Sequence, residues 1–217
     1  MTLHQVPVAN KDKVIIVGAG IGGLASSLRL SHLGYDVKVI ERANGAGGKL
    51  RTITGSTGEI DIGPTVLTLL PIFQKLFKSV GEDIFEHVDL VRQKIIARHW
   101  WPDGTSLDLH DDFETSRDAI MKFSGSSSAI EFEKYFCDTR DLFACFDLPV
   151  MQNPRPSILD MNRAVLSNPK ILPKMHPLRT LSSLLNYKFQ DIRLRQLFGR
   201  YATYVGGSPL ESPALLS

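Results

Sequence analysis

The stretch Lys13-Val-Ile-Ile-Val-Gly-Ala-Gly-Ile-Gly-Gly23 decides the fold of this chain. It opens with a lysine and four β-branched apolar residues, a pattern typical of a strand buried on both faces of a parallel sheet. Glycines then follow at Gly18, Gly20 and Gly23, and apolar residues recur at helical spacing from Ile21 to Leu28. The pattern predicts a strand, a glycine-rich turn and a helix in direct succession.

A second strand is expected at Val37–Ile40, after Gly34 ends the helix. In such a β-α-β unit the first glycine permits a tight turn, the second lets the backbone approach a pyrophosphate, and the third allows close packing of helix on strand. Glu41 directly follows the second strand, where a carboxylate accepts hydrogen bonds from ribose hydroxyls. A GxGxxG motif alone is a weak signal, but these neighbours make it specific. We therefore predict a dinucleotide site.

The residues after Glu41 indicate which dinucleotide binds. A second glycine pair, Gly47 and Gly48, brings more backbone toward the cofactor, and the basic residues beside it suit phosphate. Together with the turn at Asp61–Thr65 they favour FAD over a nicotinamide dinucleotide; the alternative is an ordinary flexible loop with solvated charges. The residues expected to bind the cofactor are Gly18, Ala19, Gly20, Gly22, Gly23, Glu41, Arg42, Gly47, Gly48, Lys49, Arg51, Pro64 and Thr65.

The rest of the chain changes character after about residue 65. A helix is expected at Pro71–Val80, and a β-hairpin is expected around the turn Pro102–Thr105. Helical segments separated by prolines follow near 113–122, 128–146, 157–166, 177–186 and 191–204.

The expected fold class is α/β. A Rossmann-like FAD-binding β-α-β unit (1–70) would be followed by a mixed α+β, mainly helical substrate and membrane-associating domain (71–217). Because a doubly wound sheet needs more than two strands, we expect an N-terminal fragment of a longer protein.

Composition narrows the class of protein. The hydrophobic share of 43% and the charged share of 22% are those of a soluble globular chain. A net charge of +2 with scattered basic residues argues against nucleic-acid binding. Cys137 and Cys145 are expected to be buried thiols, and the six histidines lack metal-ligand spacing. We expect a cytoplasmic protein without a metal, which can meet a membrane only from its surface.

The block ERANGAGGKLRT (41–52), followed by DIGPTVLT (61–68), resembles the carotenoid desaturase branch of the flavin amine-oxidase-like superfamily, the bacterial phytoene desaturase family. The stretches ARHWWPDGTSLDL (97–109) and GRYATYVGGSP (199–209) are most similar to the hydroxyneurosporene and methoxyneurosporene desaturases of that branch. The resemblance covers the chain from Lys13 onward, although family members are more than twice as long.

The resemblance implies an FAD-dependent oxidoreductase that acts on a CH–CH bond of a linear C40 carotenoid. A hydride would pass to flavin N5, a proton would leave the adjacent carbon, and the electrons would go on to oxygen or a quinone. The subfamily implies 3,4-desaturation of 1-hydroxy- or 1-methoxy-carotenoids. The resemblance leaves three alternatives: a phytoene desaturase, another flavin amine-oxidase-like oxidoreductase, or a non-catalytic FAD-binding fragment.

A polyene drawn from a bilayer implies peripheral membrane attachment and an apolar tunnel. Aromatic residues that are candidates for its lining, although each alone is more often plain core, are Trp100, Trp101, Phe132, Phe136, Phe143 and Phe146. The stretch Asp160-Met-Asn-Arg163 resembles the Asp-x-x-Arg segment of phytoene desaturases, whose acid and base are proposed to face the flavin. Asp160 and Arg163 are therefore the candidate catalytic pair; a surface ion pair at i, i+3 is the alternative. The oligomeric state stays open.

Overall fold

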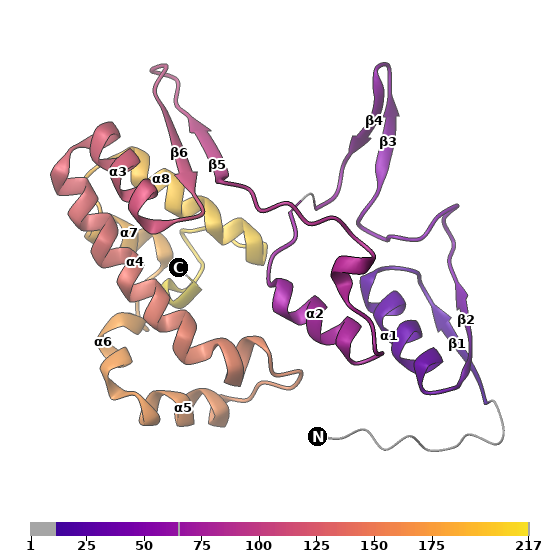
Figure 1. Ribbon diagram of the computed structural model, residues 1–217. Coiled ribbons are helices and arrows are strands. Elements are labelled where there is room, and N and C mark those ends of the chain that lie inside the picture. Colours follow the sequence, from indigo (N-terminus) through magenta and orange to yellow (C-terminus); the bar gives the residue numbers. More distant parts are fainter. Residues whose placement is uncertain (1–11, 65, 217) are drawn as a thin grey trace. The chain divides into compact units, whose positions relative to one another are not determined.

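The computed structural model describes residues 12–64 and 66–216 (Figure 1). Its internal contacts divide the chain between Val91 and Arg92 into two compact units. This boundary lies later in the chain than the expected one at residue 70, because the helix and turn that follow residue 70 pack within the first unit. The division into a cofactor domain (1–70) and a substrate domain (71–217) stays a prediction about function.

The first unit begins with β1 (Lys13–Val17), α1 (Ile21–His32) and β2 (Asp36–Ile40). The two strands are parallel, with Lys13 beside Asp36 and Val17 beside Ile40. Residues alternate between half-buried and exposed along both strands, because α1 packs on one face of the sheet. The arrangement confirms the predicted β-α-β unit.

The remainder of this unit contains a hairpin, a helix and a short turn. The hairpin pairs β3 (Thr52–Gly55) with β4 (Gly58–Asp61). Gly58 has a φ of 139°, so a glycine is needed at this tight reversal. The helix α2 spans Leu70–Lys78, and the 3₁₀ turn η1 spans Ile84–Glu86.

The second unit opens with the predicted antiparallel hairpin, β5 (Ile95–Trp100) and β6 (Ser106–His110). Helices and helical turns make up the rest: α3 Phe113–Ser124, α4 Ser126–Phe146, the π turn η2 Asp147–Met151, α5 Ile158–Ser167, η3 Pro169–Ile171, α6 Leu172–Met175, α7 Leu181–Lys188, α8 Ile192–Gly199, η4 Arg200–Val205 and η5 Ala214–Leu216. The chain therefore begins with a Rossmann-like unit and continues with a mainly helical second unit, as the sequence predicted.

Two of the predicted helices have different limits. The helix expected at 177–186 begins at Leu181, because the Thr180 hydroxyl accepts a hydrogen bond from the Ser183 N–H at 3.2 Å and caps it there. The helix expected at 191–204 ends at Gly199, and a 3₁₀ turn completes the segment. The short helix α6 was not predicted, since Pro173 lies within its four residues and Pro177 follows shortly after them.

An aromatic core holds the second unit together. The rings of Phe189 and Phe198 stack with centroids 5.0 Å apart, and Phe132 stacks on Phe198 at 5.8 Å. Tyr135 meets the edge of Phe189. Such ring pairs add to the stability already gained by burying apolar area. A second, smaller core of Leu142, Phe146 and Ile171 fastens α5 and α6 to the end of α4.

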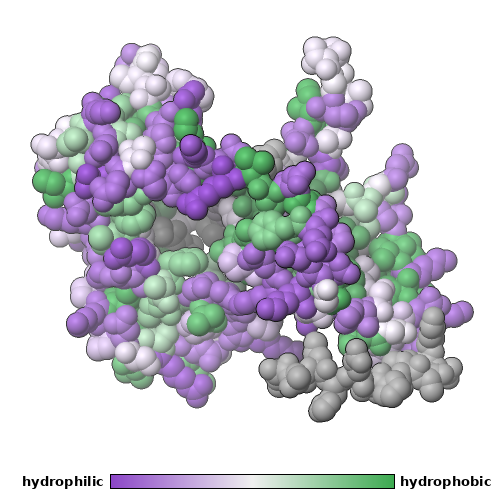
Figure 2. Space-filling model, in the orientation of Figure 1, coloured by the Kyte–Doolittle hydropathy of each residue, from purple (hydrophilic) through white to green (hydrophobic). Residues whose placement is uncertain are grey.

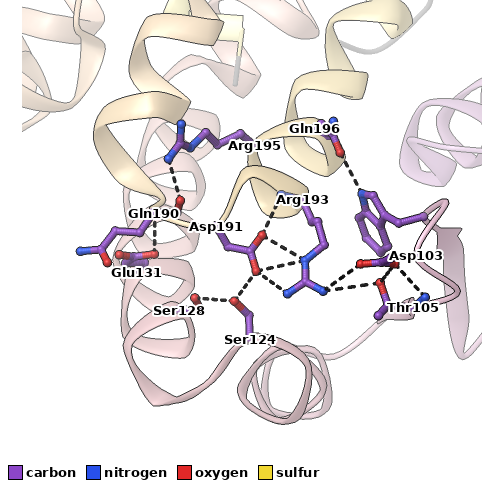
Figure 3. A network of polar contacts seen from close by, with 11 residues as sticks. Asp103, Thr105, Ser124, Ser128, Glu131, Gln190, Asp191, Arg193, Arg195 and Gln196 are labelled. Atoms are coloured by element: carbon purple, nitrogen blue, oxygen red, sulfur yellow. Dashed lines mark hydrogen bonds and ion pairs between the residues drawn. The ribbon is translucent and has the colours of Figure 1, made fainter.

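A polar network joins the tip of the β5–β6 hairpin to the start of α8 (Figure 3). The Asp191 carboxylate accepts hydrogen bonds from the Arg193 backbone N–H at 2.8 Å and from the Ser124 hydroxyl at 2.5 Å. Arg193 Nη2 lies 2.7 Å from the same carboxylate, and its Nη1 lies 3.8 Å from Asp103 in the hairpin turn. The Arg193 guanidinium hydrogen bond is the main reason that the pKa of Asp191 falls from 3.8 to about 2.

The network predicts a measurable pH dependence of stability. A carboxyl whose pKa is depressed in the folded state stabilises the fold above its unfolded pKa, and this stabilisation is lost as the pH falls from about 4 to about 2. We expect Asp191→Asn to lower the free energy of unfolding at pH 7 by about 2 kcal/mol and to flatten the pH dependence in that range. Urea unfolding between pH 2 and 7 measures both effects.

The matched control is Glu211→Gln, an exposed carboxylate of the same unit. It should change neither the stability at pH 7 nor the acid slope. Equal losses in the two variants, or an unchanged acid slope in Asp191→Asn, would contradict this account of the network.

Candidate functional site

A pocket of about 1220 Å³ lies in the first unit, where β1 and β2 end. The carboxyl ends of parallel strands, next to a helix N-terminus, are the usual ligand position in sheets of this type. Eight of the predicted cofactor residues line it: Gly18, Gly20, Glu41, Arg42, Gly48, Lys49, Arg51 and Pro64.

The glycine turn is held by backbone contacts. Gly18 has a φ of 99°, and its N–H donates to the Ile40 carbonyl at 2.7 Å, which ties the turn to the end of β2. A Cβ atom at Gly23 would lie 2.0 Å from the Gly18 carbonyl oxygen, so no side chain fits where α1 crosses the turn. Gly20 is the N-cap residue of α1 and provides no side-chain cap. The N–H groups of the first helical turn therefore suit an anion.

The second glycine pair lies directly against the first turn. The Gly47 N–H donates to the Ala19 carbonyl at 2.8 Å. A Cβ atom at Gly48 would come within 3.0 Å of the Gly20 α-carbon, so the two backbones touch with no side chain between them. A Cβ at Gly63 would similarly lie 2.1 Å from the Lys49 carbonyl oxygen. Three loops thus pack backbone against backbone around the pocket.

Glu41 connects these loops through its carboxylate. One oxygen accepts from the Ala19 N–H at 2.7 Å, and the other accepts from the Ala43 N–H at 2.9 Å. These hydrogen bonds, the one from Ala19 foremost, lower the pKa of Glu41, so that the group is an anion at neutral pH. A carboxylate offers about four acceptor positions, and two remain for hydroxyl groups of a ligand.

The charges of the lining suit a dinucleotide. Arg42, Lys49 and Arg51 are the basic residues of the pocket, and Glu41 and Asp61 are the acidic ones. Basic side chains and open helix N–H groups stabilise a pyrophosphate, whereas carboxylates accept hydrogen bonds from ribose. The donor and acceptor set therefore fits the adenosine diphosphate portion of FAD or of a nicotinamide dinucleotide.

The other predicted cofactor residues lie nearby or outside the described part of the chain. Ala19 and Gly47 contribute backbone hydrogen bonds, and Gly22 and Gly23 lie in the first turn of α1 without lining the pocket. Thr65 falls outside the described residues. The prediction omitted Gly45, Ala46, Asp61 and Gly63, which also line the pocket. The turn at Asp61–Thr65 was used as a signal that favours FAD, but the sequence did not indicate that Asp61 and Gly63 themselves line the pocket.

Asp160 and Arg163 lie in the second unit, on α5. The Asp160 carboxylate accepts from the Ser157 N–H at 3.1 Å, and the Ser157 hydroxyl oxygen accepts from the Asp160 N–H at 3.1 Å, which forms a capping box at the start of the helix. The carboxylate also accepts from the Ser157 hydroxyl at 2.6 Å. The hydroxyl contact is the main reason that the pKa of Asp160 is lowered. Arg163 Nη1 is 3.9 Å from the carboxylate, and its side chain is 78% exposed. The structure thus gives Asp160 a capping role, and the catalytic role of the pair stays a prediction.

The six aromatic residues considered for an apolar tunnel do not line one cavity. Phe132 and Phe136 line a pocket of about 480 Å³ together with Phe113, Tyr135 and Tyr201. Trp100 and Phe143 are exposed, whereas Phe146 belongs to the smaller core and Trp101 packs beside Phe123.

Comparisons with known proteins agree with this geometry. Residues 16–82 match the family of NAD(P)-binding Rossmann-like domains. The chain is 42% identical to hydroxyneurosporene desaturase of Cereibacter sphaeroides, over 94% of this chain and 41% of that protein. It is 31% identical to the 1-hydroxycarotenoid 3,4-desaturase of Flavobacterium sp. (strain P99-3), again over 94% of this chain and over 42% of the relative.

Among solved structures, a putrescine oxidase variant superposes with a TM-score of 0.57 at 18% identity, covering 94% of this chain and 40% of the oxidase. This likeness concerns the fold. The chain spans about two fifths of the length of the relatives that it matches. In sequence the chain is similar to carotenoid desaturases over most of its own length.

Proposed function

We propose that this chain is the FAD-binding and partial substrate-binding portion of a carotenoid desaturase, which 3,4-desaturates 1-hydroxy- or 1-methoxy-carotenoids. The observation that carries the proposal is the pocket formed by Gly20, Gly48 and Glu41, in a chain so similar to hydroxyneurosporene desaturases. FAD is chosen over NAD because the second glycine loop extends the pocket past the acidic strand end. The similarity to a 1-hydroxycarotenoid 3,4-desaturase supports the proposed bond position.

Each part of the pocket has a defined task in this proposal. Gly20 and Gly48 line the pocket with bare backbone, which lets the pyrophosphate approach closely, and the basic side chains of Arg42, Lys49 and Arg51 offset its charge. Glu41 accepts hydrogen bonds from the adenosine ribose. FAD, when bound, supplies the hydride acceptor that an unactivated C–C bond requires. Asp160 and Arg163 are proposed as the pair that handles the proton, on the strength of the resemblance alone.

The proposed substrate is apolar and dissolves in lipid. In residues 12–64 and 66–216, none of the helices has both the length and the apolar composition to cross a bilayer. We propose that the protein meets the membrane from the cytoplasmic side, at its surface, and passes the electrons from the reduced cofactor to oxygen or a quinone.

Three other functions compete with this one. The likeness in fold to a putrescine oxidase favours a flavin oxidase of another substrate class. A phytoene desaturase would share the cofactor but use a less conjugated carotenoid. A non-catalytic FAD-binding protein would hold the cofactor and turn over nothing. Flavin binding alone does not separate these functions, whereas the substrate assay below does.

Gly20→Val tests the position of the pyrophosphate. A Cβ atom at Gly20 is tolerated, at 3.9 Å from the Gly48 α-carbon, but the added methyl groups of valine enter the space between the two loops. We expect FAD affinity to fall by at least about tenfold, which is a loss of roughly 1.4 kcal/mol in binding free energy. Flavin fluorescence titration measures the dissociation constant. Ser26→Val, on the exposed side of α1, should leave it unchanged, and equal affinity in both variants would mean that the site is misplaced.

Glu41→Gln tests which part of the cofactor the pocket holds. The neutral amide presents an NH₂ group where the carboxylate accepts hydrogen bonds, so FAD and ADP should both bind about tenfold more weakly. FMN, which lacks the adenosine part, should bind equally to both proteins. Competition of ADP against FAD measures this, and an FMN affinity that falls in parallel with that of FAD would contradict the assignment of Glu41 to ribose.

The reaction itself is tested with the chain expressed in its full reading frame, in bacterial membranes. With 1-hydroxyneurosporene we expect a red shift of the carotenoid absorption without added NAD, since desaturation extends the conjugated system. Phytoene and putrescine are the discriminating substrates. Turnover of phytoene alone, peroxide formation from putrescine, or FAD binding without turnover of any of the three would each replace the proposed function by one of its competitors.

A further inference from the structure

Glu41 and Asp61 are the acidic residues that line the pocket of the first unit, and the proposed function gives a task to Glu41 alone. Asp61 is the last residue of β4. Because like charges repel, a carboxylate in a pocket for a pyrophosphate is unfavourable unless it faces a neutral hydrogen-bond donor of the ligand. The presence of Asp61 in the lining therefore points to such a donor.

Contacts between neighbouring segments connect the two carboxylates in a definite order. Taken from Glu41 toward Asp61, these contacts are Glu41 to Ala19, Gly20 to Gly48, Lys49 to Gly63, Arg51 to Ile62 and Thr52 to Asp61. Bare glycine backbone and the basic residues Lys49 and Arg51 thus come between the two acidic residues in this series. The lining is acidic at both ends of the series and basic in its middle.

This order of charges matches the order of groups in a dinucleotide, which has a sugar on each side of its pyrophosphate. Basic side chains and glycine backbone suit the charged pyrophosphate, whereas carboxylates accept hydrogen bonds from sugar hydroxyls. The pocket volume of about 1220 Å³ also exceeds the roughly 300–1,000 Å³ that is usual for small-ligand pockets. The pocket therefore has room for both sugars of a dinucleotide, one beside each carboxylate.

The β3–β4 hairpin leaves the Asp61 carboxylate available to a ligand. Four polar side chains share one face of this hairpin because they occupy paired positions, Thr52 opposite Asp61 and Thr54 opposite Glu59. Figure 2 shows hydrophilic residues along the hairpin, beside a few hydrophobic ones. The hydroxyls of Thr54, at 2.6 Å, and of Thr52 lower the pKa of Glu59. Asp61 is exposed, and across residues 12–64 and 66–216 no hydrogen bond or ion pair engages its carboxylate.

We propose that Asp61 accepts hydrogen bonds from the ribityl hydroxyls of FAD, as Glu41 does from the adenosine ribose at the other end of the lining. The inference rests on the proposed function, in which FAD occupies this pocket, and it adds the residue that binds the second sugar chain. A carboxylate suits this task because it only accepts hydrogen bonds, and because the ribityl chain carries a row of hydroxyl donors.

Asp61→Asn tests the proposal, since it retains the shape of the side chain and removes the charged acceptor. We expect FAD to bind about tenfold more weakly, whereas ADP, which lacks the second sugar, should bind as it does to the unaltered chain. Flavin fluorescence measures the affinity for FAD, and calorimetry measures the affinity for ADP. The matched control is Glu59→Gln, which removes the same charge from the same strand at a residue outside the described pocket lining and should change neither affinity.

A comparison with Glu41→Gln separates the two ends of the pocket. That variant should weaken ADP and FAD together, whereas Asp61→Asn should weaken FAD alone. In the double variant the two losses of FAD affinity should multiply to about a hundredfold, because the two carboxylates share no partner among the described residues. Circular dichroism and retained ADP binding establish that Asp61→Asn is folded with its glycine loops intact.

Three results would overturn the assignment of Asp61. FAD may bind equally to Asp61→Asn and Glu59→Gln; ADP may be weakened as much as FAD, which would make Asp61 a structural residue of the whole pocket; or both ligands may bind more tightly, which would mean that Asp61 only repels the pyrophosphate. ADP-ribose, which has a second ribose in place of the ribityl chain, adds a fourth. If Asp61→Asn weakens ADP-ribose and leaves FAD unchanged, a nicotinamide dinucleotide replaces FAD.

The unaltered chain separates failure of this inference from failure of the proposed function. Each of the first three results leaves FAD binding by the unaltered chain and turnover of 1-hydroxyneurosporene as they were, so the proposed desaturation stands. An unaltered chain that binds ADP but not FAD would instead remove the proposed function and, with it, the role of Asp61.

Discussion

The candidate site depends on one steric constraint: the α-carbons of glycines must touch neighbouring backbone. Gly23 lies against the Gly18 carbonyl, Gly48 against Gly20, and Gly63 against Lys49, each too close for a side chain. These contacts bring three chain segments around one pocket, which the Glu41 carboxylate then fastens by accepting N–H groups on both sides. Because the constraint acts on the backbone, the shape of the pocket does not depend on contacts between protein side chains and a ligand.

The second unit is stabilised in a different way. Stacked rings around Phe198 join α4, α7 and α8, and the Asp191–Arg193 pair fastens the hairpin tip to the same helices. The Asp191–Arg193 ion pair stabilises the unit because Asp191 is largely buried and each of its carboxylate oxygens has a hydrogen-bond partner. A more exposed ion pair, such as Asp160 and Arg163, contributes little.

Local signals allowed the sequence to predict the β-α-β unit, the second hairpin and most helices. The strand from Lys13 and the helix from Ile21 are specified by residues within a few positions of each other. Other features depend on distant partners. Whether Phe132 is core or Trp100 is exposed follows from packing between helices far apart in sequence, which a single aromatic residue does not reveal. Likewise, Asp61 and Gly63 reach the pocket only because the β3–β4 hairpin turns the chain back. The sequence suggested an acid–base role for Asp160, whereas the structure shows its carboxylate hydrogen-bonded to Ser157.

The central claim is that a dinucleotide binds in the pocket that the two glycine loops of the first unit line. Amide chemical shifts in a titration of the ¹⁵N-labelled chain with FAD and with ADP measure this most directly. We predict that both ligands shift the amides of Gly18–Gly23 and Gly45–Arg51, and that FAD shifts more of them because it is the larger ligand. Shifts confined to the second unit, or no change at Gly20 and Gly48 with either ligand, would contradict it.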